Sequence, residues 1–546
     1  MIEISFWNVL AVLFTCTILS HGMILLDNGV YWDGWLMRGW FRQKDYNACR
    51  IATSQIGLPL YYYCLRFMAM LPRPIFCYKL MSFVGMFLSS FFIYCLCRES
   101  GYLTDIQSVC VSILFLFYPA NNMMVEPSCM QYGVMHTAFL GACLLGVLAE
   151  SATGAGQWGM RAGAIVLFFV SFNMNSLLVF YLGFLMLLLF HASAAQALNL
   201  TETVYFLACR WYFWIIPFIY WGLKQRYAFT HGFYSDYNLI KFDMHRISVG
   251  LTQLFMTGVT GTYIHACAYV AKQSLKWLVP LILASWLAVD ILLRHVVSAQ
   301  ALILQSGEAS GVFYVGVVLL LAASMPYILV GQRFAVRGFE TKNNIILALP
   351  MALVVFGSAN AVLVPAALPY FLGVVVVSGA LYLNYTYLCL LSDYVKNISF
   401  LANLAKIPSA KETSVLLVHD THTLRFLAID QPEHRPPYLI YMFEWIWGDV
   451  TRIGFAETYE RMTPYPSDEV REHILHRTTI PYSLQGIDPC GKQALVTVKD
   501  GQRNCIGEVR TALKYHYFRF LKRHKLDEYL SRVTQVDLFP IRSDIK

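Results

Sequence analysis

Two aspartates follow the first apolar stretch of this chain at a position where they could carry acid–base chemistry. The stretch from Phe6 to Leu26 is long enough to cross a bilayer, and Asp27 and Asp33 come directly after it. A carboxylate at the membrane surface could act as a general base on a hydroxyl group. The simpler alternative is that an aspartate just past a span only caps a helix in a solvated loop.

The side chains around these aspartates are typical of the lipid–water boundary. Aromatic rings of the kind that settle at this depth surround the pair: Tyr31, Trp32, Trp35 and Trp40. Sugars carried on polyprenyl phosphates are presented at the same depth. The cations that follow, Arg38 and Arg42, are suited to bidentate contact with a phosphate.

The composition indicates a polytopic helical membrane protein. Hydrophobic residues make up 57% of the 546 residues and charged residues only 14%, whereas about a quarter of a soluble chain is charged. Nearly uncharged stretches of about 20 residues recur and predict about 11 or 12 membrane spans. We expect the protein in a bacterial inner membrane or an ER-type membrane. The net charge of +8 requires no nucleic acid, because membrane lipids or a phosphate-bearing substrate are sufficient partners.

Charge also divides the chain into two predicted domains. Residues 1–404 contain 36 charged side chains and residues 405–546 contain 38. We therefore expect an all-α transmembrane domain over 1–404 and a small soluble α+β domain over 405–546. The expected elements of the second domain are strands at Ser414–Val418 and Ala494–Val498, a hairpin turn at Asp500-Gly501, helices at Glu469–Arg477 and Glu508–Leu530, and a strand or short helix at Tyr438–Trp447. Cys490 and Cys505 could form a disulfide outside the cytoplasm.

Four polar sets interrupt the apolar body and are the candidates for chemistry. They are Asp27 and Asp33 with Arg38 and Arg42; Asn121, Asn122 and Glu126; the loop 224–247, with Arg226 and Arg246; and Arg294 and His295 with Glu308. Each has a structural alternative, such as a helix cap for Glu126 or snorkelling for Arg294. If all four face one side, acid, base and phosphate-binding cations could meet there.

The predicted topology depends on the stretch 161–190, which Asn173-Met174-Asn175 interrupts. With Arg333, Arg337 and Lys342 in the cytoplasm and this stretch counted as two half-helices, the four polar sets face outward and the C-terminal domain lies inside. Counted as one long helix, the stretch places the C-terminal domain outside.

The layout resembles that of the GT-C superfamily of integral-membrane glycosyltransferases. The resemblance rests on an uncleaved first span, an acid just beyond it, an amphipathic first loop and many later spans. It implies inverting transfer of a sugar from a polyprenyl-phosphate donor to a glycan, lipid or protein acceptor at the non-cytoplasmic face. It also implies that the catalytic acid is Asp33 or Asp27, with Glu126 as a second acid.

Under this resemblance, basic side chains would bind the departing lipid phosphate. The candidates are Arg38, Arg42, Arg226, Arg246, Arg294 and His295. A divalent cation stays open as a cofactor, because the sequence contains no clear metal motif. The alternatives are a transporter or lipid flippase, with an unwound substrate site at Asn173–Asn175, or a non-catalytic membrane subunit whose C-terminal domain docks a partner.

Overall fold

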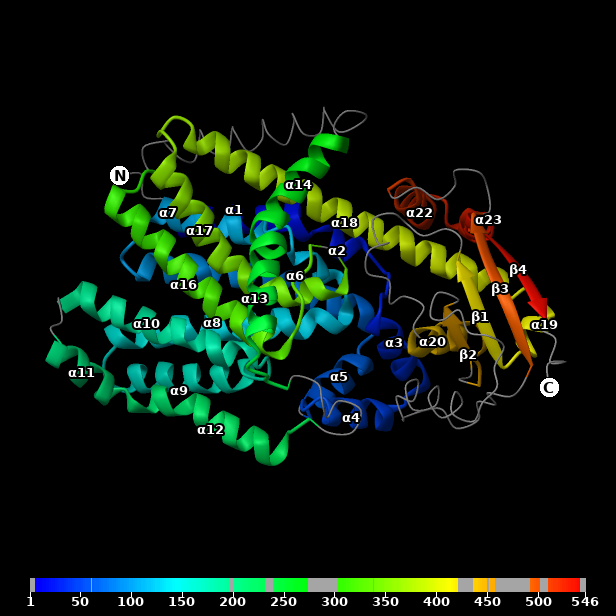
Figure 1. Ribbon diagram of the computed structural model, residues 1–546, viewed down its shortest axis with the longest axis horizontal. Helices are drawn as coiled ribbons and strands as arrows, with labels where there is room; N and C mark the ends of the chain where they lie inside the picture. Colours follow the sequence, from blue (N-terminus) through cyan, green and yellow to red (C-terminus); the bar gives the residue numbers. More distant parts are fainter. Residues whose placement is uncertain are drawn as a thin grey trace.

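A computed structural model describes the chain in ten segments. They are residues 5–59, 61–196, 200–230, 239–273, 302–336, 338–420, 436–448, 451–456, 492–500 and 509–540. A bundle of apolar helices forms the larger part, and a small α/β unit is attached at one end of it (Figure 1). We call this end of the bundle the domain end and the opposite one the far end. The predictions for Glu469–Arg477, Arg294, His295, Cys490 and Cys505 lie outside the described residues.

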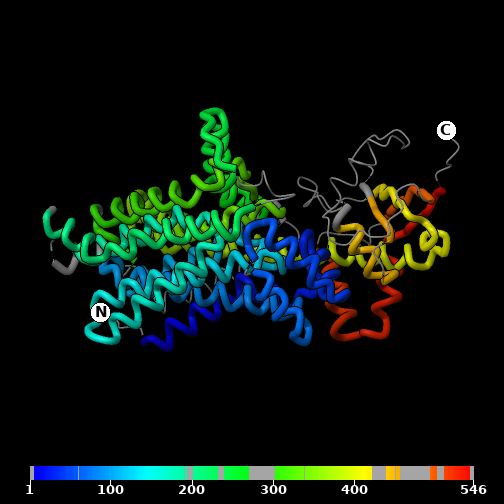
Figure 2. The backbone as a smooth tube through the Cα atoms, turned by 90° about the horizontal axis from the view of Figure 1, so that it is seen from below, coloured from blue at the N-terminus to red at the C-terminus, as the bar shows by residue number. Residues whose placement is uncertain are grey.

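The bundle consists of helices that run mostly along one axis between the two ends (Figure 2). Their bounds are α1 Phe6–His21, α2 Met23–Leu26, α6 Pro74–Glu99, α7 Asp105–Leu116, α8 Met130–Ser151, α9 Gly154–Ser171, α10 Ser176–Gln196, α11 Leu200–Cys209, α12 Trp211–Tyr227, α13 Met244–Gln253, α14 Thr260–Gln273, α16 Ser306–Val330, α17 Ala348–Val362 and α18 Leu368–Leu404. A π-helical turn, Leu254–Val259, joins α13 to α14.

Several of these helices are candidates to cross a membrane. Within the described residues five are long and apolar enough: Pro74–Glu99, Pro127–Ser151, Gly307–Val330, Phe339–Val362 and Leu368–Leu404. A sixth candidate is the bent pair Thr201–Cys209 and Trp211–Tyr227, which is long and apolar enough if the two helices form one span. Three other helices are apolar but shorter: Phe6–His21, Asp105–Leu116 and Ser176–Leu189. The protein is therefore a helical, multi-pass membrane protein.

The stretch 161–190 is a helical hairpin. The ring of Phe168 in α9 lies 4.8 Å from Tyr181 and 4.7 Å from Phe184 in α10, although a single straight helix would separate residues 13 positions apart by roughly 20 Å. The asparagines lie in the turn between two antiparallel helices. Neither a long tilted helix nor a pair of half-helices describes this segment.

The first loop folds into three short helices at the domain end. They are α3 Asp33–Gln43, α4 Tyr46–Gln55 and α5 Tyr61–Met70. Asp45 begins α4 by accepting a hydrogen bond from the backbone N–H of Ala48 at 3.0 Å. Three further short 3₁₀ segments lie at this end of the bundle: Asn121–Val125, Pro127–Cys129 and η7, Phe339–Leu347.

The C-terminal unit is a four-stranded mixed sheet with helices. Its elements are β1 Val415–Asp420, α20 Pro436–Trp447, β2 Ile453–Ala456, β3 Gln493–Asp500, α22 Arg510–Leu521, α23 Leu526–Val533 and β4 Thr534–Pro540. The order is β2-β1-β3-β4, with β1 parallel to β2 and β3. Both predicted strands are present and Tyr438–Trp447 is helical. The predicted helix Glu508–Leu530 is broken into α22 and α23 at Lys522–Lys525, and the antiparallel partner of β3 is the distant β4.

Helix α18 joins the two units without a break. Its last turns pack inside the C-terminal unit, where Ser399 donates a hydrogen bond to the carbonyl of Leu530 at 2.6 Å. Asn403 donates to the carbonyl of Thr534 at 2.7 Å. The change in charge density at residue 404 therefore coincides with the end of α18, and the structural junction lies several turns earlier in that helix.

The expected topology is wrong in one respect, because the loop after α16 lies beside the first loop. The ring of Phe339 is 5.7 Å from Trp32, and Thr341 donates to Oδ1 of Asn122 at 2.8 Å. The error has a specific source. Lys241 contacts Leu329 at the domain end, whereas Ile303 contacts Gln107 at the far end. Lys241 and Ile303 therefore lie at opposite ends of the bundle, whereas the two spans expected between them would have placed both at the same end.

Candidate functional site

Asp27 is buried at the domain end of the bundle with its carboxylate fully engaged. Oδ1 accepts a hydrogen bond from the N–H of Gly29 at 2.6 Å and lies 3.2 Å from the ammonium of Lys79. Oδ2 accepts from the hydroxyl of Tyr31 at 2.7 Å. Both oxygens of this carboxylate are thus engaged with groups of the first loop and of α6. Asp27 therefore serves to hold the loop and Lys79 in place.

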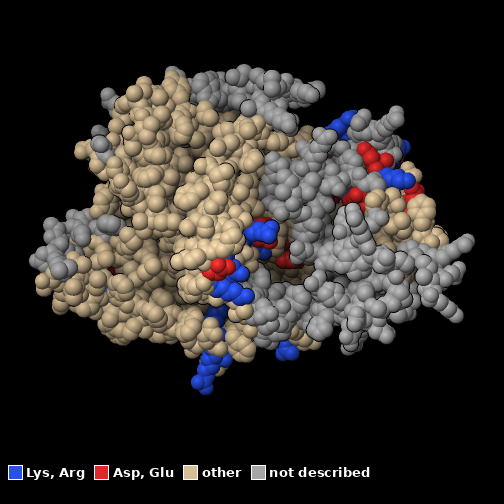
Figure 3. Space-filling model, in the orientation of Figure 1, with Lys and Arg blue, Asp and Glu red and all other residues tan. Residues whose placement is uncertain are grey.

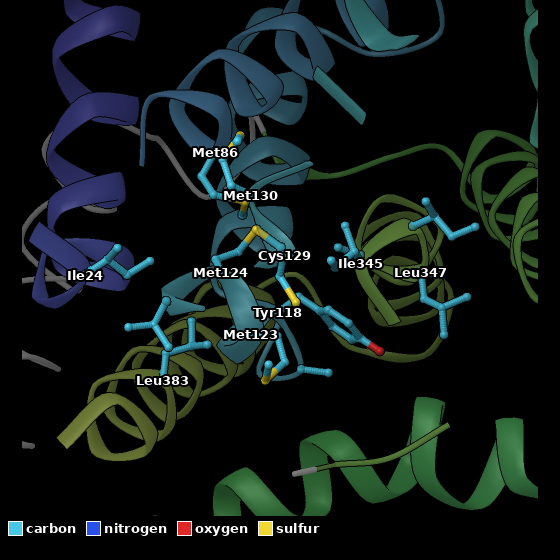
Figure 4. Packing of buried hydrophobic residues seen from close by; sticks show 14 of the residues in the cluster. Ile24, Met86, Tyr118, Met123, Met124, Cys129, Met130, Ile345, Leu347 and Leu383 are labelled. Atoms are coloured by element: carbon cyan, nitrogen blue, oxygen red, sulfur yellow. The ribbon is translucent and has the colours of Figure 1, made fainter. Parts of the chain in front are cut away.

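Glu126 is buried in the short connection between α7 and α8. Its Oε2 accepts a hydrogen bond from the N–H of Tyr31 at 3.0 Å, and Oε1 accepts from the hydroxyl of Ser128 at 3.1 Å. The connection is embedded in apolar side chains from other elements: Met123, Met124 and Cys129 lie among Ile24, Met86, Ile345 and Leu383 (Figure 4). Burial, and then the charge of Asp33, raises the pKa of Glu126 to about 8, so this carboxyl is mostly protonated at neutral pH.

Asp33 is the more accessible of the three acids. It is half-buried in the first turn of α3, where the helix dipole favours a negative charge. Oδ1 accepts a hydrogen bond from the hydroxyl of Tyr438 in α20 at 3.0 Å. Among the described residues this is the one hydrogen bond to its carboxylate. The preceding residue, Trp32, has a φ of 35°, a strained conformation for a side chain of this size.

The structure places Glu126 directly against the start of α3. A Cβ added to Gly34 would lie 2.8 Å from Oε1 of Glu126, so a larger residue at this position would have to displace the carboxyl. The more accessible Asp33 and the buried Glu126, whose pKa is raised, thus share one small region. A buried carboxyl that stays protonated beside a more accessible carboxyl is an arrangement suited to the roles of acid and base.

Arg38 and Arg42, the predicted phosphate ligands of α3, instead connect α3 to the C-terminal unit and to α18. The guanidinium of Arg38 lies 5.1 Å from the ring centre of Trp445 and donates to the hydroxyl of Tyr394 at 3.2 Å. The exposed Arg42 donates to the carbonyl of Trp445 at 2.6 Å and lies 3.7 Å from the carboxylate of Glu444.

The other predicted residues within the described segments, Arg226, Arg246 and Glu308, make their contacts away from Asp33. Arg226 is exposed at the end of α12, and its guanidinium lies 5.6 Å from the ring centre of Tyr227. Arg246 packs against Gly331. Glu308 caps the first turn of α16 at the far end. The expectation that all four polar sets face one side is therefore wrong for the set containing Glu308, for the same reason as the topology.

Lys79, which the sequence analysis did not select, approaches the carboxyl groups of Asp27 and Glu126, and Lys342, also not selected, lies in the neighbouring segment η7. Lys79 lies in α6 and lowers the pKa of Glu126 through its charge, although burial is the larger effect. Lys342 in η7 is 8% exposed, and its ammonium lies 3.7 Å from the ring centre of Phe339. It makes no ion pair within the part of the chain that the structure describes. A lysine inside an apolar span was the available signal for Lys79, whereas Lys342 had been assigned to the opposite side.

The described residues include no group of three or more His, Cys, Asp or Glu side chains placed to hold a metal ion. Comparison with known protein families, curated proteins and solved structures finds no match to this chain. The arguments for function therefore rest on the geometry of the chain itself.

Charge is distributed unevenly between the two ends. Figure 3 shows a wide uncharged surface toward the far end, whereas the charged side chains of that face gather toward the domain end. The described connections at the domain end contain Arg38, Arg42, Lys44, Arg50, Arg66, Arg73, Lys224, Arg226, Lys241, Arg246, Arg333 and Lys342; those at the far end contain Arg98, Arg161 and Arg210. The positive-inside tendency assigns such a basic end to the cytoplasm.

Proposed function

We propose that this protein is a membrane glycosyltransferase of GT-C-like layout, which transfers a sugar from a polyprenyl-phosphate donor to an acceptor hydroxyl. The observation that supports it best is the pairing of Asp33 with Glu126 beside Lys79 at the bundle end, with Lys342 in the neighbouring segment η7, where Phe339 contacts Trp32. Base, acid and cations are the groups that this reaction requires, and they lie where the apolar helices end. The number of spans, 11 or 12 in the sequence analysis, is part of the same proposal.

In the proposed reaction, Asp33 accepts the proton of the acceptor hydroxyl as its oxygen attacks the anomeric carbon. The bond from that carbon to the phosphate oxygen breaks, and the electron pair leaves with the polyprenyl phosphate. The attack comes from the face opposite the phosphate, so the configuration inverts. Negative charge grows on the phosphate, where Lys342 would stabilise it and the protonated Glu126 would donate a hydrogen bond.

We place the reaction on the cytoplasmic side. The resemblance to GT-C enzymes implied the non-cytoplasmic side. The expected topology agreed with it by placing the first loop and the loop after α16 on opposite sides, but these loops lie together. The basic character of the whole domain end then favours the cytoplasm. The acceptor is drawn from the glycans, lipids or proteins that reach this surface.

The transporter alternative loses the observation that motivated it. The asparagines at 173 and 175 lie in a turn between antiparallel helices, so they do not interrupt a spanning helix at mid-membrane. A transporter site is expected near the midplane, whereas Asp33 and Glu126 lie where the bundle meets the C-terminal unit.

A release assay tests the proposal. The full-length protein in lipid nanodiscs is incubated with a panel of polyprenyl-phosphate-linked hexoses and crude acceptor lipids, and free polyprenyl phosphate is measured by mass spectrometry. We expect release with at least one donor, and a loss on the order of tenfold or more in Lys342→Met, because the leaving group then lacks its cation. Lys44→Met, which removes an exposed lysine of the first loop, is the control. No release with any donor, or equal release by both variants, contradicts the proposal.

A further inference from the structure

Helix α22 presents an apolar face that no part of the described structure covers. Leu513, Tyr517, Phe520 and Leu521 are 54%, 42%, 55% and 75% exposed. Their spacing places them on one side of the helix. The other side is packed, with Tyr515 buried and the ring of Phe518 stacked at 4.9 Å on Tyr529. The exposed face is therefore a surface of a well-anchored helix.

Basic side chains accompany this apolar face within α22 and in the residues that follow the helix. Lys514 and Arg519 lie within α22, and Lys522, Arg523 and Lys525 follow it directly, all three exposed. The acids that come next are Asp527 and Glu528, and Glu528 is paired with Arg532. An apolar face bordered by excess positive charge is typical of helices that lie in the surface of an anionic membrane.

The position of α22 along the bundle also agrees with a place at the membrane surface. Arg519 donates to the carbonyl of Leu26, the last residue of α2, at 2.8 Å. Leu26 is 47% exposed, and Ile18 and Leu19 of α1 are 47% and 54% exposed, so an apolar surface leads from α1 toward α22. Figure 2 shows α22 just beyond the end of α1 and α2, on the same side of the molecule.

We propose that α22 lies in the membrane surface, with Tyr517, Phe520 and Leu521 at the boundary of headgroups and acyl chains. Lys522, Arg523 and Lys525 contact anionic headgroups there. The same helix holds the candidate site, because Tyr515 and Arg519 both hydrogen-bond Asn28, at 2.9 Å and 2.8 Å, next to Asp27. Contact with lipid thus supports the loop that carries the acids. This inference does not depend on the proposed reaction.

Photo-crosslinking from the helix tests it. A benzophenone amino acid replaces Phe520 in the full-length protein, in nanodiscs of phosphatidylcholine with or without phosphatidylglycerol, and adducts are identified by mass spectrometry. The matched control carries it at Phe539, an aromatic residue of the same unit that is 50% exposed in β4. We expect lipid adducts at 520 several-fold above those at 539, with phosphatidylglycerol adducts favoured over phosphatidylcholine adducts.

The cations are tested in the same system. Replacing Lys522, Arg523 and Lys525 by Gln removes charge from exposed positions and should leave the fold intact, as the melting temperature will report. The preference for phosphatidylglycerol should then fall toward that of phosphatidylcholine. Equal lipid labelling at 520 and 539, or adducts at 520 that join a protein in place of a lipid, would overturn the proposal. A headgroup preference that the triple replacement leaves unchanged would also overturn it.

Discussion

The hydroxyl of Tyr438 donates a hydrogen bond to the carboxylate of Asp33 at 3.0 Å, joining residues 405 positions apart in the chain. The C-terminal unit is thus part of the candidate site. A donor from α20 fixes the orientation of the one acid that is accessible enough to act as a base.

Removing that hydroxyl should impair transfer without unfolding the protein. A hydrogen bond to a charged group contributes about 1.5–3 kcal/mol, so Tyr438→Phe should lower the transfer rate on the order of tenfold. The control is Tyr441→Phe on the same helix, which loses a hydrogen bond from Nε1 of Trp40 at 2.9 Å and does not contact Asp33. Equal loss in both variants would show that α20 acts only by packing.

Glu126 should make the stability of the protein depend on pH. Its pKa is raised to about 8 in the folded protein from an ordinary value of 4.5, so the folded state favours the protonated form. The stabilisation is complete below pH 4.5 and is lost as the pH rises toward and through 8. The melting temperature should fall across this window in the native protein.

The variant Glu126→Gln isolates this effect. It keeps an uncharged group of the same size, so its melting temperature should vary less between pH 5 and 9 than that of the native protein. The corresponding difference in the free energy of unfolding is about a few kcal/mol. Identical pH profiles for the two proteins would show that Glu126 is ionised at neutral pH and cannot donate to a leaving phosphate.

The ion pair of Asp27 and Lys79 should behave as a structural unit. Removing one partner leaves a buried charge uncompensated, so Asp27→Asn or Lys79→Met alone should destabilise the protein by about 3–5 kcal/mol. The double variant should recover much of this loss. Unfolding in detergent with urea measures all three. Additive losses in the double variant would show that the two charges do not interact as the structure places them.

The sequence predicted the general architecture because composition alone carries that signal. Uninterrupted apolar runs require helices in a bilayer, and Ser414–Val418 and Ala494–Val498 were strand-like by residue type alone. It also directed attention to Asp27, Asp33 and Glu126, because acids stand out where apolar helices end. Their grouping is seen only in the fold, because Gly34 of α3 makes the contact with Glu126 and a glycine in the sequence gives no chemical sign of such a contact.

The cations were harder to predict because their positions depend on topology. Lys342 lies at the domain end because α16 ends beside the first loop, whereas the expected topology placed the loop after α16 at the opposite end and removed Lys342 from consideration. The arginines of α3 were chosen for their proximity in sequence, but the aromatic side chains of α18 and α20 engage Arg38. Such long-range packing has no counterpart in local sequence patterns.

The side of the membrane is a further prediction. The C-terminal unit and Asp33 lie at the same end of the bundle, so a reporter fused after Lys546 shows on which side of the membrane both lie. The basic character of this end predicts that green fluorescent protein fused there will fluoresce and that alkaline phosphatase will be inactive. An active phosphatase would contradict this and return the site to the non-cytoplasmic side that the resemblance to GT-C enzymes implies.

The most direct test of the account is the transfer activity of Asp33→Asn. Asp45→Asn is the matched control, because Asp45 lies in the same loop, caps α4 and keeps a capping side chain as asparagine. Release of polyprenyl phosphate from the donor that the native protein uses should fall by a factor on the order of 10² or more in Asp33→Asn. It should stay close to the native rate in Asp45→Asn, with both variants folded. Native-like release by Asp33→Asn would contradict the assignment of Asp33 as the base.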